Sequence, residues 1–409
     1  MSEKRFDASM SRAKFGGTPD VWFCPLGKLM QARHEDKYDM LRGLAAIAVL
    51  IPHIAQTFLY RLIGDDNPFA MVTGTVARHA VLIFFLLSGF LITLSMGSNI
   101  RRNGRLDVSE YLSARIARIY PPLIGAIAIV LLACAIIMGL GLPGSIRYGL
   151  PGDLSAVRDH FSVHAKDIVL ALLMQKGLLD ADGPLWSLYF EFHLYIIAMF
   201  VALATTSKSS THRAIHAVVA LALAGLWTAQ EKQFVFYMVV WSLGAAVSIW
   251  REKLMAVATR RVFATLVWIV AIAFVATLIL APRYLVVDHP SVAISFCIQF
   301  AICIAYVYFI FLVDWGSSPA RWLVRSGDFS YSLYVIHFPL LLLVLSLTQT
   351  WMGMSLSRAI LVSAAAALAV VAISIVFARF FENQRRFKPR IRRAVNAISR
   401  IGRSAPSTP

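Results

Sequence analysis

Apolar residues along this chain gather into long, nearly uncharged runs that short polar and basic segments separate. Most runs approach the roughly 20 residues that a helix needs to cross the hydrocarbon core of a bilayer. Lipid offers the backbone no hydrogen-bond partner, so spanning segments must be helices rather than open sheet. The pattern predicts an all-α polytopic membrane protein with a bundle of about ten transmembrane helices, at residues 40–60, 79–97, 122–141, 184–206, 214–229, 234–250, 262–281, 291–313, 330–349 and 358–378.

One further apolar run, DIVLALLMQKGLL at residues 167–179, is short. Its uninterrupted part reaches about 16 Å as a helix, roughly half of the hydrocarbon core. It is either a short span or a re-entrant, partial helix. The charge of the loops favours the second interpretation. If this segment crossed the membrane, every later loop would change sides, and most of the basic loops that follow would lie outside.

Cytoplasmic loops of membrane proteins carry an excess of Lys and Arg. With ten spans and a cytoplasmic N-terminus, 30 of the 39 Lys and Arg residues lie on the cytoplasmic side. Both termini are therefore expected in the cytoplasm. We divide the chain into an N-terminal extension (1–37), a membrane domain (38–381) and a basic tail (382–409). We expect no cleavable signal peptide, because the first 35 residues are polar and basic.

Composition supports the membrane assignment. The 409 residues are 58% hydrophobic and only 15% charged, more apolar than a soluble protein of this length accommodates. The net charge of +17 concentrates in the tails and certain loops, which fits membrane orientation better than binding to nucleic acid. The four cysteines have no metal-ligand spacing, so no metal site is expected.

Two ionisable residues lie on the first predicted helix. Arg42 is at its cytoplasmic mouth, and His53 follows eleven positions later, about 16 Å along the axis and on nearly the same face. Pro52 precedes His53 and favours a local kink. Ionisable groups within a membrane are costly, so they indicate function by default. A lipid-facing anchor for Arg42 and a helix–helix hydrogen bond for His53 are the alternatives.

A carboxylate lies within the fourth predicted helix. Glu191 is about 10 Å below the outer surface, a depth comparable to that of His53. Such a group needs a cationic or hydrogen-bonding partner, and His53 is the expected one. Tyr195 follows one turn later as a supporting residue. The alternative is an ion pair that only holds two helices together.

Three further segments add candidates. Arg115 and Arg118 share a helical face on the cytoplasmic side and suit a phosphorylated ligand, although a positive-inside charge pair is the alternative. Ser88 and Gly89 favour close helix packing, with access of an acyl chain to the backbone as the alternative. His337 lies inside the ninth predicted span, where structural hydrogen bonding is the simpler interpretation.

Taken together, these stretches resemble the acyltransferase-3 family of integral-membrane acyltransferases. Five motifs occur in the family's order and cover most of the chain: YDMLRGLAAIAVLIPH (38–53), FFLLSGFLI (84–92), RIARIYPP (115–122), LWSLYFEFHLY (185–195) and YSLYVIHFPL (331–340). The resemblance implies transfer of an acyl group, commonly acetyl, from acyl-CoA to an extracytoplasmic carbohydrate. It implies a stand-alone form without an SGNH-type hydrolase domain.

From this combination we expect Arg42, Arg115 and Arg118 to hold the anionic end of cytoplasmic acyl-CoA, which is a donor substrate and not a permanent cofactor. The pantetheine arm, about 15–20 Å long, would bring the thioester to His53. His53 would act as general base, or as an acyl carrier, with Glu191 orienting it.

The expected partners are acyl-CoA, a carbohydrate acceptor and the lipid bilayer, alongside polysaccharide-biosynthesis machinery in a bacterial inner membrane, and no nucleic acid. Two other functions stay open. Buried His and Glu would also serve the proton relay of a secondary transporter or flippase, although the chain lacks the internal symmetry common in transporters. A non-catalytic scaffold or glycan sensor is the third.

Overall fold

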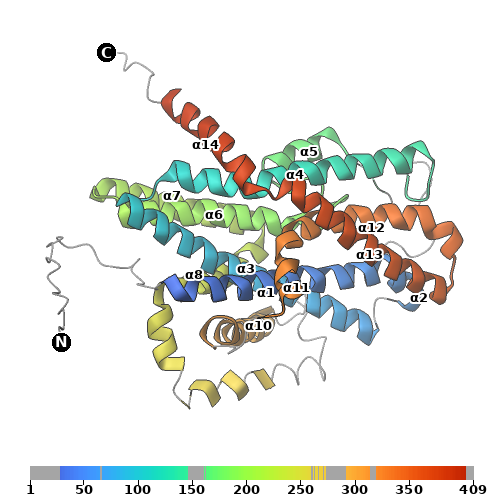
Figure 1. The fold of residues 1–409 in the computed structure, drawn as a ribbon, viewed down its shortest axis with the longest axis horizontal. Helices are drawn as coiled ribbons and strands as arrows, with labels where there is room; N and C mark the ends of the chain where they lie inside the picture. The colour runs from blue at the N-terminus through green and yellow to red at the C-terminus, as the bar shows by residue number, and fades with distance from the viewer. Residues whose placement is uncertain are drawn as a thin grey trace, which may run out of the picture.

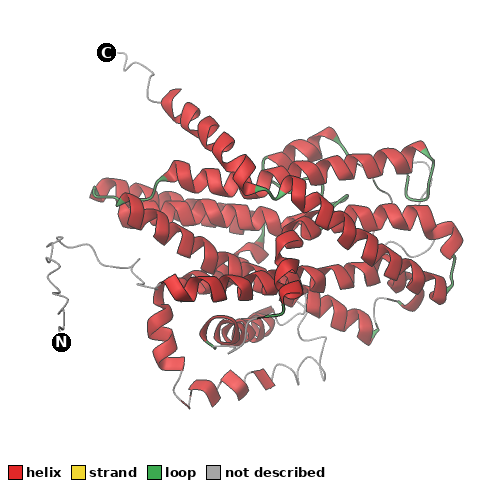
Figure 2. Cartoon of the chain, viewed as in Figure 1, coloured by secondary structure: helices red, strands yellow, loops and turns green. Residues whose placement is uncertain are grey.

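The protein is a bundle of helices in a computed structural model. The structure describes residues 28–64, 67–145, 161, 163–258, 292–313 and 319–401, together with several residues between 261 and 272. Turns and short loops join the helices, and the described part of the chain contains no strand (Figure 2).

Sixteen helical elements are assigned within these residues (Figure 1). They are α1 (Lys28–Ile54), η1 (Ala55–Leu59), α2 (Tyr60–Ile63), α3 (Pro68–Asn103), α4 (Val108–Gly139), α5 (Ala165–Leu172), α6 (Leu185–Thr206), α7 (Ser210–Gln230), α8 (Lys232–Ala258), α10 (Val292–Val307), η4 (Tyr308–Leu312), α11 (Arg321–Ser326), η5 (Gly327–Phe329), α12 (Ser330–Met352), α13 (Leu356–Phe381) and α14 (Gln384–Ile401).

Eight helical stretches of the described chain are long and apolar enough to cross a membrane. They match eight of the ten predicted spans, and the chain is an all-α, multi-pass membrane protein. The predicted span at 291–313 corresponds to α10 and η4, in which the apolar helix Ile298–Leu312 is shorter. Most of the predicted span at 262–281 lies outside the described residues.

The sequence marks the ends of the long helix α3 clearly. Asn67 caps its N-terminus by accepting a hydrogen bond from the backbone N–H of Ala70, and Pro68 occupies the first helical position. Gly104 ends the helix with a φ of 69°, a left-handed conformation that glycine adopts without steric cost. The boundaries of α3 are thus encoded locally.

Two glycines allow α3 and α8 to pack at close range. A Cβ placed on Gly89 would overlap the carbonyl oxygen of Trp241, and one on Gly244 would overlap that of Leu86. Small residues permit such an approach of two helix backbones in membranes. The packing interpretation of the Ser88-Gly89 step is therefore supported.

A short helix and a buried coil precede α6. The predicted partial helix at 167–179 is α5 followed by a turn, in which the Tyr189 hydroxyl donates to the carbonyl of Gly177 at 2.6 Å. Ala181 and Asp182, in the same connection, have no exposed surface. α6 consequently begins inside the protein: the Tyr334 hydroxyl of α12 donates to the carbonyl of Pro184 at 3.0 Å.

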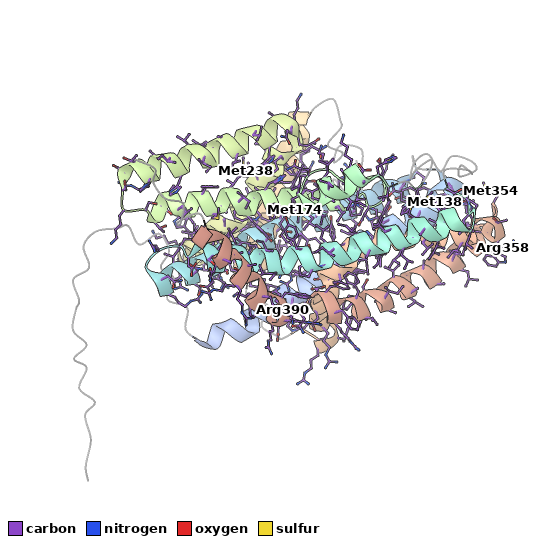
Figure 3. The ribbon with its side chains drawn as sticks, turned by 90° about the horizontal axis from the view of Figure 1, so that it is seen from above. Met138, Met174, Met238, Met354, Arg358 and Arg390 are labelled. Atoms are coloured by element: carbon purple, nitrogen blue, oxygen red, sulfur yellow. The ribbon has the colours of Figure 1, made fainter. Side chains whose placement is uncertain are left out.

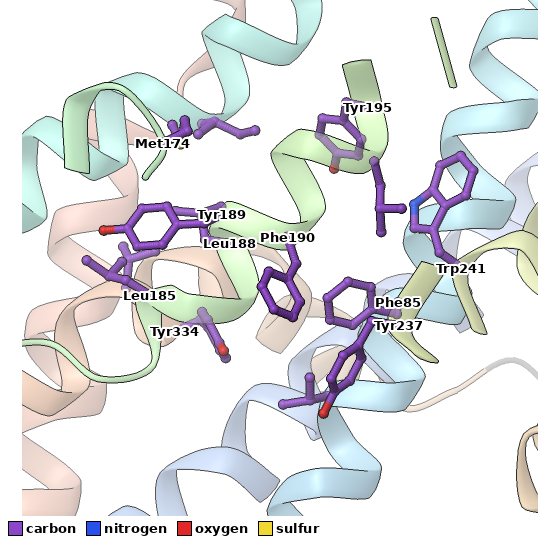
Figure 4. Packing of buried hydrophobic residues seen from close by; sticks show 14 of the residues in the cluster. Phe85, Met174, Leu185, Leu188, Tyr189, Phe190, Tyr195, Tyr237, Trp241 and Tyr334 are labelled. Carbon is purple, nitrogen blue, oxygen red and sulfur yellow. The ribbon is translucent and has the colours of Figure 1, made fainter. Parts of the chain in front are cut away.

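The two ends of the bundle differ in composition. α12 and α13 lie toward one end of the long axis and α6 and α7 toward the other (Figure 1). Met138, Met354 and Arg358 gather at the first end, where α12 turns into α13 (Figure 3). An aromatic and aliphatic core fills the space between α3, α6, α8 and α12, as Figure 4 shows around Phe190 and Tyr237.

The basic tail is structured at its start. Residues 384–401 form α14, which packs against α4. Arg392 approaches Asp107 at 3.5 Å, and Ser109 hydrogen-bonds to Asn396. The exposed side of α14 carries several of its arginines, among them Arg390 (Figure 3).

Candidate active site

Six of the eight predicted site residues line one cavity, which holds about 790 Å³ of empty space including its open mouth. Four helices contribute them, α1, α3, α4 and α6, and the residues are Arg42, Ser88, Arg115, Arg118, Glu191 and Tyr195. The tertiary structure therefore gathers side chains that are up to 153 positions apart, which no local pattern could show.

An acidic group lies at the centre of this cavity. Glu191 accepts hydrogen bonds from the hydroxyls of Ser88, at 2.6 Å, and Tyr195. Glu191 and Tyr195 are four positions apart on α6 and so project from one face. The indole N–H of Trp241 donates to the Ser88 hydroxyl at 3.2 Å, which fixes that hydroxyl toward the carboxylate (Figure 4 shows Tyr195 and Trp241).

Two of the three arginines sit on α4 beside this carboxylate. Arg115 approaches the rings of Tyr111 and Tyr195, with 5.8 Å from its guanidinium carbon to each ring centroid. Arg118 interacts electrostatically with Glu191 and Tyr195. One carboxylate thus faces two guanidinium groups, and the local excess of positive charge suits an anionic ligand.

The third arginine, Arg42, carries its own counter-ion. Its guanidinium pairs with Asp39 at 2.6 Å, one turn earlier on α1. It also experiences the positive charge of Arg118 and the negative charge of Glu382. Because Asp39 offsets one positive charge, Arg42 can lie close to Arg118 without a bound anion.

Glu382 is a site residue that the sequence analysis assigned to the tail. Its carboxylate accepts the backbone N–H of Ser332 at 2.7 Å, which joins the end of α13 to the start of α12. Burial raises the pKa of the Glu382 carboxyl, and the Ser332 hydrogen bond and the charges of Arg118 and Arg42 oppose that rise. Glu382 therefore belongs to the arginine cluster rather than to a free tail.

The two remaining predicted residues, His53 and His337, form a pair. His337 Nε2 lies 3.1 Å from His53 Nδ1, and the ring centroids are 5.0 Å apart. His337 is 1% exposed. His337, rather than Glu191, thus lies where the sequence analysis expected the partner that orients His53.

Backbone carbonyls determine the tautomers of this pair. His337 Nδ1 lies 2.9 Å from the carbonyl oxygens of Leu333 and Tyr334, and carbonyls only accept. His337 therefore carries its proton on Nδ1 and accepts through Nε2. His53 Nδ1 lies 2.9 Å from the carbonyl of Val49 and so is also a donor. A neutral His53 then has its lone pair on Nε2, the nitrogen that can take a proton.

Local backbone irregularity surrounds His53. Pro52 lies inside α1 and cannot donate the usual helical hydrogen bond. A π-helical turn, η1, begins two residues later, and the Thr57 hydroxyl donates to the carbonyl of His53 at 2.7 Å. π-Turns inside helices occur frequently at functional sites. The kink that the sequence predicted at Pro52 thus coincides with a change of helix type.

Tyr334 connects the cavity with the histidine pair. Its side chain lines the cavity, while its ring centroid is 6.1 Å from that of His337 on the same helix. Its hydroxyl is hydrogen-bonded to Ser187 at 2.6 Å and to the carbonyl of Pro184. The part of the cavity that Tyr334 lines is therefore adjacent to the imidazole of His337 and, through it, to that of His53. We call this space, lined by Arg42, Arg115 and Arg118, the arginine cavity.

The sequence analysis missed five residues of this region. Two of them had a local signal: Asp39 is one helical turn before Arg42, and Glu382 is the first acidic residue after an apolar run. The other three reach the site only through packing. They are Ser187, Trp241 and Tyr334.

Comparison with known proteins identifies the family of this chain. Residues 35–379 match the acyltransferase domain of the acyltransferase-3 family. Nodulation protein 10 of Rhizobium leguminosarum bv. viciae is 31% identical over 199 residues, 47% of this chain and 50% of that protein. The chain thus spans about half the length of this relative.

Two other relatives are similar over shorter or comparable stretches. Protein 2 in picA locus of Rhizobium radiobacter is 29% identical over 46% of this chain and 92% of that protein. The O-acetyl transferase of Shigella phage Sf6 is 29% identical over 39% of this chain and 44% of its own length. No solved structure matches the chain. Because the domain match covers most of the sequence, this chain belongs to the acyltransferase-3 family.

Proposed function

We propose that the protein transfers an acyl group, acetyl in the first instance, from cytoplasmic acyl-CoA to a hydroxyl of an extracytoplasmic or lipid-linked carbohydrate. The observation that carries this proposal is the adjacency of an arginine-lined cavity to a part-buried histidine pair. The name of the phage relative, O-acetyl transferase, agrees with it. We place the reaction in a bacterial inner membrane, with the acceptor an exopolysaccharide, an O-antigen or a similar glycan.

The donor side of the proposal rests on charge. Arg42, Arg115 and Arg118 line the cavity with Glu191, and Asp39 and Glu382, which are not among the lining residues, offset part of their charge. Guanidinium groups bind phosphate through paired hydrogen bonds, so they suit the anionic part of acyl-CoA. The pantetheine arm would continue past Ser88 toward Tyr334, which places the thioester near His53.

The chemical step follows from the tautomers. His53 Nε2 removes the proton of the acceptor hydroxyl as the oxygen attacks the thioester carbonyl. The tetrahedral intermediate collapses, the carbon–sulfur bond breaks, and the CoA thiolate takes the proton back from the His53 imidazolium. His337 accepts the Nδ1–H of His53 throughout and so keeps Nε2 directed at substrate. In the alternative, an acyl-histidine relay, His53 Nε2 attacks the thioester and the CoA thiolate leaves; the acceptor oxygen then takes the acyl group from the nitrogen, and its proton passes to the thiolate.

Glu191 takes a different role from the one expected from sequence. Its contacts are with Ser88, Tyr195 and the charge of Arg118. It therefore positions the guanidinium of Arg118 and the hydroxyls of Ser88 and Tyr195, which line the cavity proposed to bind acyl-CoA. His337 takes the role of orienting His53.

The test compares cell-surface glycans from cells that contain the wild-type protein, the His53→Ala variant or no protein. Mass spectrometry gives the acyl group from the mass difference and the sugar from the fragments. We expect the acyl mass with wild type and its loss with His53→Ala at equal protein level. Acylation that persists with His53→Ala would refute the base assignment, and identical glycans with and without the wild type would refute the function.

A further inference from the structure

A second hollow lies at the end of the bundle where the turn between α3 and α4 meets the turn between α6 and α7. Its empty space is about 2350 Å³, including the part open to solvent. The side chains used below are Arg105, Leu112, Leu203, Lys208, His212 and Val395. We call this hollow the terminal groove. The loop charges predict that it faces the cytoplasm.

The terminal groove carries uncompensated positive charge. Arg105 and Lys208 are exposed. The neighbouring acids already have partners, because Asp107 approaches Arg392 and Glu110 pairs with Arg102 at 2.6 Å. α4 and α7 begin at the groove and α3 and α6 end there, so the helix dipoles offset one another and the positive charge comes from the side chains.

The walls of the groove also offer apolar and ring surface. Leu112 on α4, Leu203 on α6 and Val395 on α14 line it, and the exposed imidazole of His212 lies at its edge. A flat heterocycle can lie on such a surface while its phosphates reach basic side chains. Charge and shape together suit an adenine nucleotide.

The groove continues the arginine cavity along two helices. Leu112 lines the groove and Arg115, one turn later on α4, lines the cavity. On α6, Leu203 lines the groove and Tyr195 lines the arginine cavity, and the two residues are about 12 Å apart along the helix axis. A ligand with a nucleotide at one end and a long flexible arm at the other would span both.

We propose that the terminal groove binds the adenosine 3′-phosphate end of acyl-CoA, a subsite that rests on the proposed acyl transfer. Arg105 and Lys208 contact the 3′-phosphate, and the adenine lies on Leu112, Leu203 and Val395. The pyrophosphate then reaches Arg115 at the entrance of the arginine cavity. This division moves the adenosine 3′-phosphate to the groove and leaves the pyrophosphate to the arginines of the cavity.

Binding to CoA and to dephospho-CoA, which lacks only the 3′-phosphate, tests this subsite without knowledge of the acceptor. Calorimetry on the purified full chain should show roughly tenfold tighter binding of CoA by the wild type, the effect of one charge-assisted contact. Lys208→Ala and Arg105→Ala should remove this preference and leave the affinity for dephospho-CoA unchanged. Lys232→Ala, an exposed lysine at the opposite turn, should keep it.

The outcomes separate the subsite from the function. If both groove variants keep the wild-type preference for CoA, or weaken both ligands equally, the subsite is wrong while acyl transfer stands. If the wild type binds neither ligand, the proposed donor and hence the function fail. A melting temperature equal to that of the wild type shows that each variant is folded.

Discussion

His337 Nε2 lies 3.1 Å from His53 Nδ1, whose N–H it shares with the carbonyl of Val49, and the contact joins the ninth predicted span to the first. Two backbone carbonyls on α12 hold the proton of His337 on its other nitrogen. A neutral imidazole here does what a carboxylate does in serine hydrolases, where the acceptor fixes the tautomer of the base. A neutral acceptor avoids placing a second charge in a buried site.

Replacing His337 should slow the reaction without weakening the donor. His337→Ala removes one of the two acceptors near His53 Nδ1–H and leaves the Val49 carbonyl, and we expect kcat to fall roughly tenfold to a hundredfold, part of what a general base contributes. His337→Gln, whose amide oxygen can accept the same hydrogen, should recover a portion. Acyl-transfer kinetics at varied acyl-CoA check this, and a rise in KM alone would contradict it.

Neutralising Glu191 should instead affect the donor. Glu191→Gln keeps an acceptor for Ser88 and Tyr195 but removes the charge beside Arg118. We expect a changed KM for acyl-CoA, with a pH profile of kcat like that of the wild type, because His53 keeps its partner. If the variant shifts the acid limb of that profile as a His337 variant does, then Glu191 orients His53 after all.

Removing Arg118 should lower stability as well as donor affinity. Arg118→Ala leaves Glu191 and Glu382 without part of their compensating charge. Removing one partner of a fully buried ion pair costs about 3–5 kcal/mol, and we expect a smaller loss here because Arg118 is half-buried. The double variant Arg118→Ala/Glu382→Gln should regain part of the loss. Thermal unfolding of the four proteins in detergent gives the cycle, and strictly additive effects would show that the two groups are independent.

Glycine at position 89 should be required for packing. A methyl group there would overlap the backbone of Trp241, so Gly89→Ala should cost about 1–3 kcal/mol and displace Ser88 from Glu191. Gly74→Ala on the same helix meets nothing within 4 Å and is the matched control. Thermal midpoints compare the two, and equal values would mean that α3 and α8 do not depend on this contact.

Much of the fold follows from local properties. The eight long spans are encoded by runs of apolar residues, and the ends of α3 by Asn67, Pro68 and Gly104. These features act within a few residues of each other, so pattern reasoning recovers them. The same reasoning misplaced the partner of His53, because Glu191 and His337 are both polar groups at plausible depths, and depth does not say which faces of two helices meet.

The sequence alone determined that the chain is a multi-pass helical protein, and through its motifs which charged residues matter. Only the tertiary structure decided that Arg42, Arg115 and Arg118 share one cavity with Glu191, that His53 pairs with His337, and that Glu382 returns from the end of α13 to this cluster. The physical reason is the separation along the sequence over which each interaction acts. Hydrophobic length and helix capping act between neighbours in sequence, whereas the rotation and depth of each helix are determined by packing against all the others.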